Sequence, residues 1–395
     1  MAFEVREVHA AGYRSLRDIR FPVGRLSVFI GANGAGKTNL YRALQLLQAS
    51  ANGTLSRELA YEGGMSSACW AGRRRAKQPV RIDLGVTFDP ADSTQENATA
   101  YSYTVSLGQV TYELSLGVAQ PAAAAFLKEP QIKDEAVFLT HDGGRAVKML
   151  ERRGPHVVAR DEEGRRVDLA VALMASETAL AAIEEPQNFP DLHAIRRTML
   201  NWRFYHDFRT DADSALRRPC LAVTSPALAS DGSNLAAVFA TLVHIRQDTK
   251  DLQRMIDDAF PGARLVVPQP DSAASFGMVF AEFPNREFTA SELSDGTVRY
   301  LALAGALMAY RLPSFIALNE PETSLHPDLL DPLARLIVSA SERSQIWLVT
   351  HSERFAAALA KYGKLKPMTV LKRDGETWIE GLKLTGDFRA EEEDE

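Results

Sequence analysis

This chain of 395 residues has no long hydrophobic run, only two cysteines and no excess of basic residues. Each of these absences excludes a class of protein. The longest apolar stretch, residues 300–310, is about half of the ~20 residues that a membrane-spanning helix needs. The two cysteines, Cys69 and Cys220, can form no disulfide framework and match no zinc-binding spacing. Residues 1–10 contain no apolar segment typical of a secretory signal. We therefore expect a cytoplasmic protein in a reducing compartment, with no membrane partner.

The charge balance excludes a strongly basic nucleic-acid-binding protein. There are 45 Lys and Arg residues against 51 Asp and Glu residues, a formal charge of −6. One dense basic run, RRRAK at 73–77, is typical of a solvated loop, and contact with nucleic-acid phosphate is the alternative. Residues 386–395 end in EEEDE, and we expect them to form a solubilising acidic tail.

The composition is that of an ordinary globular protein, 46% hydrophobic and 24% charged, with a length of about two to three domains. Neither an internal repeat nor sustained heptads occur, which excludes long coiled-coil arms. Alternating strand and helix patterns at both ends enclose a middle of antiparallel and helical character. We therefore expect a discontinuous α/β domain, residues 1–120 and 275–385, with a mixed, mostly helical insertion at 121–274 that includes a helix near 168–184.

Strict alternation of apolar and polar residues predicts an antiparallel β lobe within the first of these segments. The stretch 82–88 alternates in this way, as do 101–107 and 110–116. The last two are separated by Gly108 and Gln109, a pair suited to a type II′ turn. We expect them to form a hairpin in which all apolar side chains share one face.

A glycine-rich segment is the most informative feature of the sequence. Residues 31–38, GANGAGKT, match the pattern G-x-x-x-x-G-K-[ST] in full. In such a loop the backbone N–H groups and the helix N-terminus bind phosphates, while Lys37 contacts the β- and γ-phosphates and the Thr38 hydroxyl binds Mg²⁺. An apolar strand pattern at 26–30 precedes the loop, and apolar residues at helical spacing follow it: Leu40, Ala43, Leu44 and Leu47. The segment therefore predicts a nucleoside triphosphate site.

Three further motifs follow in the second half of the chain. LSDGT at 293–297 opens an expected helix, and its Ser and Asp alone are typical of an N-cap. LNEPETSLHP begins at the end of an apolar strand pattern, where Glu320 is a candidate base for positioning water. VTHS at 349–352 places His351 at the end of another such strand.

In this order the four motifs resemble those of RecF/SMC-like ABC-type ATPase heads, and more closely those of the short RecF-like AAA-family ATPases of bacteria. The resemblance covers residues 1–50 and 276–375. It implies an α/β fold of the P-loop NTPase, ABC-ATPase type, with an antiparallel β lobe and a helical insertion. The nucleotide-binding residues that it implies are Gly31, Asn33, Gly34, Ala35, Gly36, Lys37, Thr38, Asn39, Ser294 and Gly296.

The same resemblance implies roles in catalysis and assembly. Lys37, Glu320 and His351 become catalytic residues, of which Glu320 orients the attacking water and His351 senses the γ-phosphate. Ser294 and Gly296 belong to a signature that reaches the γ-phosphate bound by the other subunit. The resemblance therefore implies a homodimer with ATP sandwiched between its subunits, and residues 322–326 form the D-loop.

One position departs from the family pattern. Asn319 stands where an aspartate usually precedes the catalytic glutamate, so an amide replaces a carboxylate beside Mg²⁺, whose expected ligands are Thr38 and Asn319. We expect this exchange to weaken the metal site and to slow hydrolysis. The Q-loop glutamine is not assigned, and its candidates are Gln78, Gln95 and Gln187.

The sequence thus predicts an ATPase that closes as a dimer around ATP and couples hydrolysis to a DNA-related process, repair or phage defence, or to a separate effector protein. The alternative is a non-hydrolysing, ATP-gated switch, because of Asn319. A transporter subunit is disfavoured, since such subunits have a far shorter interval between loop and signature than residues 39–293. The stretch after His351 is too short for the nuclease domain of some relatives.

Overall fold

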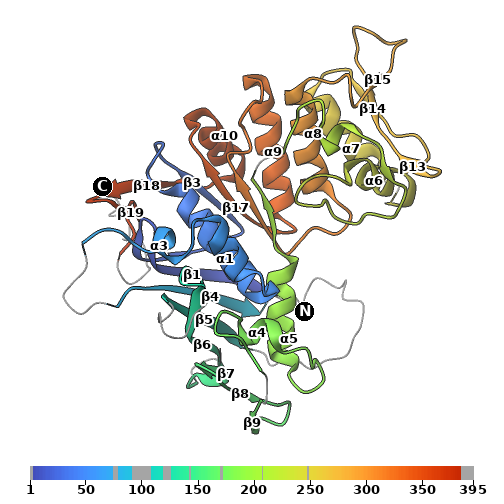
Figure 1. Ribbon diagram of the computed structural model, residues 1–395. Coiled ribbons are helices and arrows are strands. Elements are labelled where there is room, and N and C mark those ends of the chain that lie inside the picture. The colour runs from blue at the N-terminus through green and yellow to red at the C-terminus, as the bar shows by residue number, and fades with distance from the viewer. Residues whose placement is uncertain are drawn as a thin grey trace. The chain divides into compact units, whose positions relative to one another are not determined.

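The computed structural model describes residues 3–73, 79–90, 108–118, 126–141, 144–169, 172–206, 208–246 and 249–383. Its contacts divide the chain into two compact units, shown by their elements in Figure 1. The first unit comprises Met1–Gly24, Gly31–Trp202 and Thr369–Glu395, and the second comprises Arg25–Ile30 and Arg203–Met368. The domain limits expected from the sequence, 1–120 with 275–385 and 121–274, stay a prediction.

An antiparallel sheet of eight strands dominates the first unit, in the order β2-β1-β4-β5-β6-β7-β8-β9 (Figure 1). Neighbouring strands along this order are all antiparallel. The sheet is the β lobe that the sequence predicts, and it extends as far as Asp168. Its strands are β1 (Phe3–Tyr13), β2 (Leu16–Pro22), β4 (Arg81–Pro90), β5 (Gln109–Val118), β6 (Pro130–Thr140), β7 (Val147–Arg153), β8 (His156–Arg160) and β9 (Arg166–Asp168).

The alternating patterns at 82–88 and 110–116 form strands as predicted, but the hairpin pairing expected for the second of them is wrong. The alternating apolar residues are buried on one face of each strand: Val110, Tyr112, Leu114 and Leu116 in β5, and Ile82, Leu84, Val86 and Phe88 in β4. The two edges of β5, however, pair with β4 and β6, as in Phe88↔Val110 and Leu139↔Val110. Residues 101–107, the expected partner in the hairpin, lie outside the described residues. Alternation determines which face is buried and does not determine the partner.

Helix α1 (Lys37–Asn52) contacts β1 and β4 of this unit, together with α2 (Leu55–Tyr61), α4 (Ala179–Ala182) and α5 (Pro190–Asn201). The helix expected near 168–184 is mostly wrong, because a single turn, α4, forms there. That turn begins where buried Glu135 accepts hydrogen bonds from the backbone N–H groups of Ala179, at 2.7 Å, and Leu180, at 3.0 Å. A distant carboxylate therefore decides where the turn starts. The unit also contains α3 (Met65–Ala68) and an antiparallel hairpin of β18 (Met368–Arg373) and β19 (Glu376–Ile379), in which β19 contacts β2.

A parallel sheet forms the centre of the second unit, with the strands in the order β10-β16-β17-β3. Both central strands, β16 and β17, are buried along their whole length, which is typical of a parallel sheet covered on two faces. Helices α9 and α10 contact β17 and each other. The bounds are β3 (Leu26–Ile30), β10 (Arg203–Tyr205), β16 (Phe315–Asn319), β17 (Gln345–Thr350), α8 (Asp295–Met308), α9 (Leu330–Ser341) and α10 (Glu353–Gly363).

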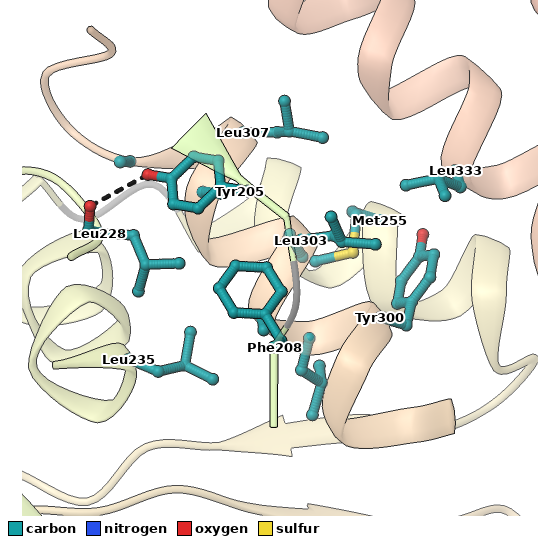
Figure 2. Packing of buried hydrophobic residues seen from close by; sticks show 14 of the residues in the cluster. Tyr205, Phe208, Leu228, Leu235, Met255, Tyr300, Leu303, Leu307 and Leu333 are labelled. Atoms are coloured by element: carbon teal, nitrogen blue, oxygen red, sulfur yellow. Dashed lines mark hydrogen bonds between the residues drawn. The ribbon is translucent and has the colours of Figure 1, made fainter. Parts of the chain in front are cut away.

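The remaining elements of the second unit share its hydrophobic core. Figure 2 shows part of this core, in which the Tyr205 hydroxyl donates a hydrogen bond to the Leu228 carbonyl at 3.0 Å. Residues from different helices meet there, including Leu235, Tyr300 and Leu333. The elements are η1 (Ala215–Arg217), β11 (Cys220–Leu221), α6 (Leu235–Ala240), the π-helix η2 (Thr241–Arg246), α7 (Thr249–Ala259), β12 (Arg264–Val266), β13 (Ala273–Ala274), β14 (Gly277–Val279), β15 (Phe288–Thr289) and η3 (Pro327–Leu329). Among the described residues of the chain, no helix has the length and hydropathy to span a membrane.

Candidate functional site

The glycine-rich loop directly precedes α1, which begins at Lys37 with Gly36 as its N-cap residue. Gly34 and Gly36 have φ angles of 79° and 100°, values that only glycine adopts without strain. Alternate positive φ angles let backbone N–H groups converge into a concave anion-binding surface, and the positive end of the helix dipole adds to it. The loop therefore has the backbone conformation that phosphate binding requires.

Close packing behind the loop makes glycine obligatory at position 36. A Cβ atom there would lie 1.8 Å from Oγ1 of Thr377 and 2.7 Å from Oγ of Ser15. Gly31 is similarly restricted, because its Cβ would lie 2.5 Å from the carbonyl oxygen of Val370. Both glycines thus serve the packing of the loop against β18 and β19 as well as its backbone conformation.

Three hydroxyl and amide side chains hold the loop from behind. The Asn39 side-chain amide donates to Oγ of Ser15 at 2.6 Å, and the hydroxyls of Ser15 and Thr377 lie 2.6 Å apart. Thr377 Oγ1, which is buried, also donates to the carbonyl of Ala35 at 2.9 Å. Ser15 and Thr377 were not predicted, and no local signal marks them, because each is a small polar residue far from the loop in sequence.

The Lys37 ammonium is folded back over the loop. It donates to the carbonyls of Gly31, at 2.5 Å, and Ala32, at 3.0 Å, and the residue is 4% exposed. A buried cation at a helix N-terminus is a strong anion-binding group. Thr38, the next residue, is exposed at the start of α1.

The register of the parallel sheet in the second unit aligns the carboxyl ends of three strands. Asn319 at the end of β16 pairs with Val349, and Thr350 at the end of β17 pairs with Ile30. Ile30 ends β3 and is the last residue before the glycine-rich loop. Ligand sites of open α/β sheets form at this edge, just beyond the carboxyl ends of the strands. The polar residues predicted at the ends of strands β16 and β17 therefore share one edge.

Glu320 has a constrained backbone immediately after β16. Its φ angle is 48°, in the left-handed region that non-glycine residues rarely adopt. The peptide groups are held on both sides: the N–H donates to the Val349 carbonyl at 2.8 Å, and the carbonyl accepts from Arg299 at 3.4 Å. The carboxylate lies 3.4 Å from Nδ1 of His351 and is partly exposed. Strain held by surrounding contacts is typical of functional positions.

A second carboxylate accompanies Glu320. The Glu322 side chain is only 5% exposed, and its Oε1 accepts a hydrogen bond from the Thr350 hydroxyl and lies 3.7 Å from Nδ1 of His351. Oγ1 of Thr350 in turn accepts from the Ser352 backbone N–H at 2.9 Å. The structure thus brings together Glu320, Glu322 and His351, whereas the sequence analysis placed Glu322 only in the D-loop.

The Asn319 side chain is held by a histidine that the sequence analysis missed. Its amide Nδ2 lies 2.7 Å from Nδ1 of His206, the residue after β10. Its Oδ1 is buried and has no hydrogen-bond partner within the described residues. An unpartnered amide oxygen at this edge fits a hard cation or one of its water ligands. The sequence signal for His206 is weak, because the strand before it, β10, is three residues long and contains Arg203.

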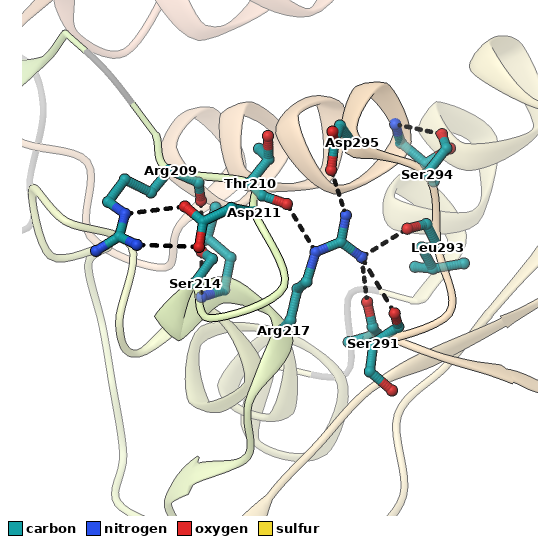
Figure 3. A network of polar contacts seen from close by, with 12 residues as sticks. Arg209, Thr210, Asp211, Ser214, Arg217, Ser291, Leu293, Ser294 and Asp295 are labelled. Atoms are coloured by element: carbon teal, nitrogen blue, oxygen red, sulfur yellow. Dashed lines mark hydrogen bonds and ion pairs between the residues drawn. The ribbon is translucent and has the colours of Figure 1, made fainter.

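The signature segment caps α8, as Figure 3 shows. Oγ of Ser294 accepts from the Thr297 backbone N–H at 3.2 Å, which is the N-cap geometry. A Cβ atom at Gly296 would lie 3.1 Å from the Ser324 carbonyl, so the segment around Ser324 packs closely against the start of this helix. Ser294 and Gly296 therefore lie at the positive end of α8.

A buried arginine organises the segment before this helix (Figure 3). The Arg217 guanidinium is 7% exposed and donates to the carbonyl of Leu293 at 2.6 Å and to Oδ1 of Asp295 at 2.6 Å. Further bonds join it to the carbonyls of Ala290, at 3.1 Å, and Thr210, at 2.8 Å. Arg217 thus fixes the backbone that presents Ser294. The sequence analysis missed it, because nothing near residue 217 indicates this contact.

Several predicted features receive no support here. Gln187, a candidate for the Q-loop, lies in an exposed turn, and Gln78 and Gln95 lie outside the described residues. Most of the basic run 73–77 and the acidic tail 386–395 also lie outside them.

The glycine-rich loop between β3 and α1, the parallel sheet and the antiparallel lobe define a P-loop NTPase with the fold of ABC and SMC heads. The chain belongs to the family described as "AAA domain, putative AbiEii toxin, Type IV TA system", whose profile matches residues 26–118 and 158–357. This membership confirms the resemblance to P-loop ATPases of the AAA family, for which ATP is the consistent ligand.

One solved structure supports the fold, and two more are similar chains. An SMC head bound to the C-winged helix domain of ScpA is 16% identical, with 95% of this chain and 97% of that chain covered and a TM-score of 0.53. The SMC head domain of Thermotoga maritima is 14% identical, with 95% of this chain and 98% of that chain covered and a TM-score of 0.47. An SMC head derived from Pyrococcus furiosus, bound to the C-terminal domain of ScpA, is 15% identical, covering 97% of each chain, with a TM-score of 0.49. Among curated protein sequences, none matches this chain.

Proposed function

We propose that this protein is an ATPase that binds ATP with its glycine-rich loop, hydrolyses it slowly and closes as a homodimer around it. The observation that carries the proposal is the alignment of strand ends, with Asn319 and Glu320 after β16, His351 after β17 and the glycine-rich loop after β3. The family membership supports ATP as the nucleotide.

Each residue has a role that its chemistry supports. Lys37 and the loop N–H groups bind the β- and γ-phosphates, and Glu320 accepts a hydrogen bond from the attacking water. His351, 3.4 Å from Glu320, contacts the γ-phosphate and orients that carboxylate. Thr38 and Asn319 provide oxygen ligands for Mg²⁺, which neutralises charge on the β- and γ-phosphates when bound.

Asn319 decides between a slow ATPase and the second candidate, a non-hydrolysing switch. Its neutral amide attracts a cation less than a carboxylate would, so we expect Asn319→Asp to raise phosphate release by roughly tenfold, corresponding to about 1.4 kcal/mol of added stabilisation. The measurement is steady-state phosphate release with ATP and Mg²⁺, comparing Asn319→Asp with wild type.

The two functions give different results in this assay. Measurable wild-type turnover that Asn319→Asp increases supports the ATPase. A silent wild type beside an active Asn319→Asp variant supports the switch. If neither protein hydrolyses ATP, both the role of Glu320 and the metal role of position 319 are wrong.

The dimer is proposed from the signature. Ser294 caps α8 and lies at its positive end, where its hydroxyl and the helix dipole suit the γ-phosphate bound by a second copy. We expect Ser294→Arg to abolish ATP-dependent dimerisation, because a bulky cation replaces the small hydroxyl at a close contact. Size-exclusion chromatography with light scattering, with and without ATP, measures this.

A matched control is Ser339→Arg, which places the same side chain on an exposed position of α9. This variant should still dimerise with ATP. If Ser294→Arg dimerises as well as wild type, the signature does not lie at the interface and the sandwich arrangement is refuted.

We further propose that hydrolysis drives a DNA-related process, repair or phage defence, or a separate effector protein. The family description names a putative AbiEii toxin of a type IV TA system, which supports a link between the ATPase and an effector function. The solved SMC head that carries a ScpA domain is an example of such a head with a protein partner.

A further inference from the structure

We propose that His206 is a positioning residue, which fixes the Asn319 amide so that its oxygen, and not its NH₂ group, faces Mg²⁺. The inference deepens the proposed function and rests on the metal role given there to Asn319. It explains how an asparagine can stand where a carboxylate is usual.

The sheet places these two residues side by side. β10 and β16 are parallel, and their register pairs Tyr205 with Leu318. His206 follows Tyr205, and Asn319 follows Leu318, so the two residues are neighbours across the strands. Nδ1 of His206 lies 2.7 Å from Nδ2 of Asn319. This is a short, direct contact between a ring nitrogen and an amide nitrogen.

In the structure the amide nitrogen of Asn319 faces Nδ1 of His206, and this orientation assigns the donor and the acceptor. An amide nitrogen only donates, so Nδ1 of His206 accepts from Asn319, and the ring carries its proton on Nε2. Oδ1 of Asn319 is then turned to the other side, where it is buried and has no partner among the described residues. A buried acceptor without a partner is unfavourable, so the amide would otherwise rotate to seek one.

An asparagine needs this constraint and an aspartate does not. The two ends of an amide differ, and a half-turn about the last side-chain bond would present NH₂, the positive end of the amide dipole, to the cation. The two oxygens of a carboxylate are equivalent, so the same half-turn changes nothing. Histidine contacts of this kind, one step removed from the metal, orient ligands in many metal sites.

The test measures nucleotide affinity as a function of Mg²⁺, with a fluorescent ATP analogue and no turnover. Removing the acceptor with His206→Phe, which keeps a ring of similar size, should raise the Mg²⁺ concentration for half-maximal binding by about tenfold. His206→Gln, whose side-chain oxygen can accept the same hydrogen bond, should restore much of the loss. Affinity in EDTA and the thermal unfolding temperature should match those of wild type for both variants.

A double-substitution experiment separates positioning from a general structural role. In the Asn319→Asp background, His206→Phe should change the Mg²⁺ response less than about twofold, because a carboxylate needs no orientation. An equal shift in both backgrounds overturns the inference, as does an unchanged Mg²⁺ response in His206→Phe alone. If wild-type affinity does not respond to Mg²⁺ at all, the proposed metal role of Asn319 fails and the inference falls with it.

Discussion

Replacing Lys37 by alanine is expected to lower ATP affinity by about 100-fold. This corresponds to about 3 kcal/mol of binding free energy, the contribution of one or two charge-assisted hydrogen bonds. The physical reason is the position of the ammonium. It is 4% exposed, lies at the N-terminus of α1 and is held by the carbonyls of Gly31 and Ala32. Phosphate oxygens entering the loop would meet a cation that is already ordered and largely desolvated. Isothermal titration calorimetry with ATP measures the loss.

The control is Lys383→Ala, which removes an exposed lysine of the same unit and should leave ATP affinity unchanged. A thermal unfolding measurement accompanies both variants, because Lys37→Ala also leaves two loop carbonyls without that donor. If Lys37→Ala folds and binds ATP as wild type does, the glycine-rich loop is not the nucleotide site, and the proposed function fails at its first step.

Replacing Glu320 by glutamine is expected to lower the rate of phosphate release by roughly 100- to 1000-fold, the range for removal of a general base. Glutamine has the same shape, and backbone contacts to Val349 and Arg299 hold the residue at its positive φ angle. The geometry should therefore persist while the negative charge that accepts a proton from water is lost. ATP binding should remain, so the dimer should stay closed for longer than that of wild type.

Single-turnover phosphate release, together with light scattering over time, measures both consequences. The matched control is Glu342→Gln, an exposed carboxylate at the end of α9, which should hydrolyse ATP at the wild-type rate. If Glu320→Gln hydrolyses ATP at the wild-type rate, Glu320 is not the catalytic base. The neighbouring buried carboxylate of Glu322 would then be the next residue to substitute.

Much of the local structure follows from short patterns. The glycine-rich loop is recognisable because phosphate binding depends on consecutive backbone groups, and these are encoded within residues 31–38. The strand β4 and the helix α1 follow from apolar periods of two and of 3.6 residues, which any single face of such elements requires. These features depend on residues close together in the chain, so they can be predicted without knowing which elements pack against them.

Strand pairing lies beyond such patterns. The apolar face of β5 is correct from alternation alone, yet alternation does not identify its partners, which are β4 and β6. Likewise only the short helix α4 forms where a helix near 168–184 was expected. Its first turn begins where Glu135, on a different element, accepts hydrogen bonds from two backbone N–H groups. In both cases several local conformations or pairings bury the same side chains, and contacts within the whole sheet determine which of them forms.

The sequence by itself determined the class of this protein, because its four motifs consist of residues that act through neighbours a few positions away. Only the tertiary structure decided which distant side chains support them. Ser15 and Thr377 close behind Gly36, Arg217 holds the backbone before Ser294, and His206 meets Asn319. Each contact joins residues far apart in the chain, and a hydrogen bond forms only where packing and strand register bring donor and acceptor to within about 3 Å.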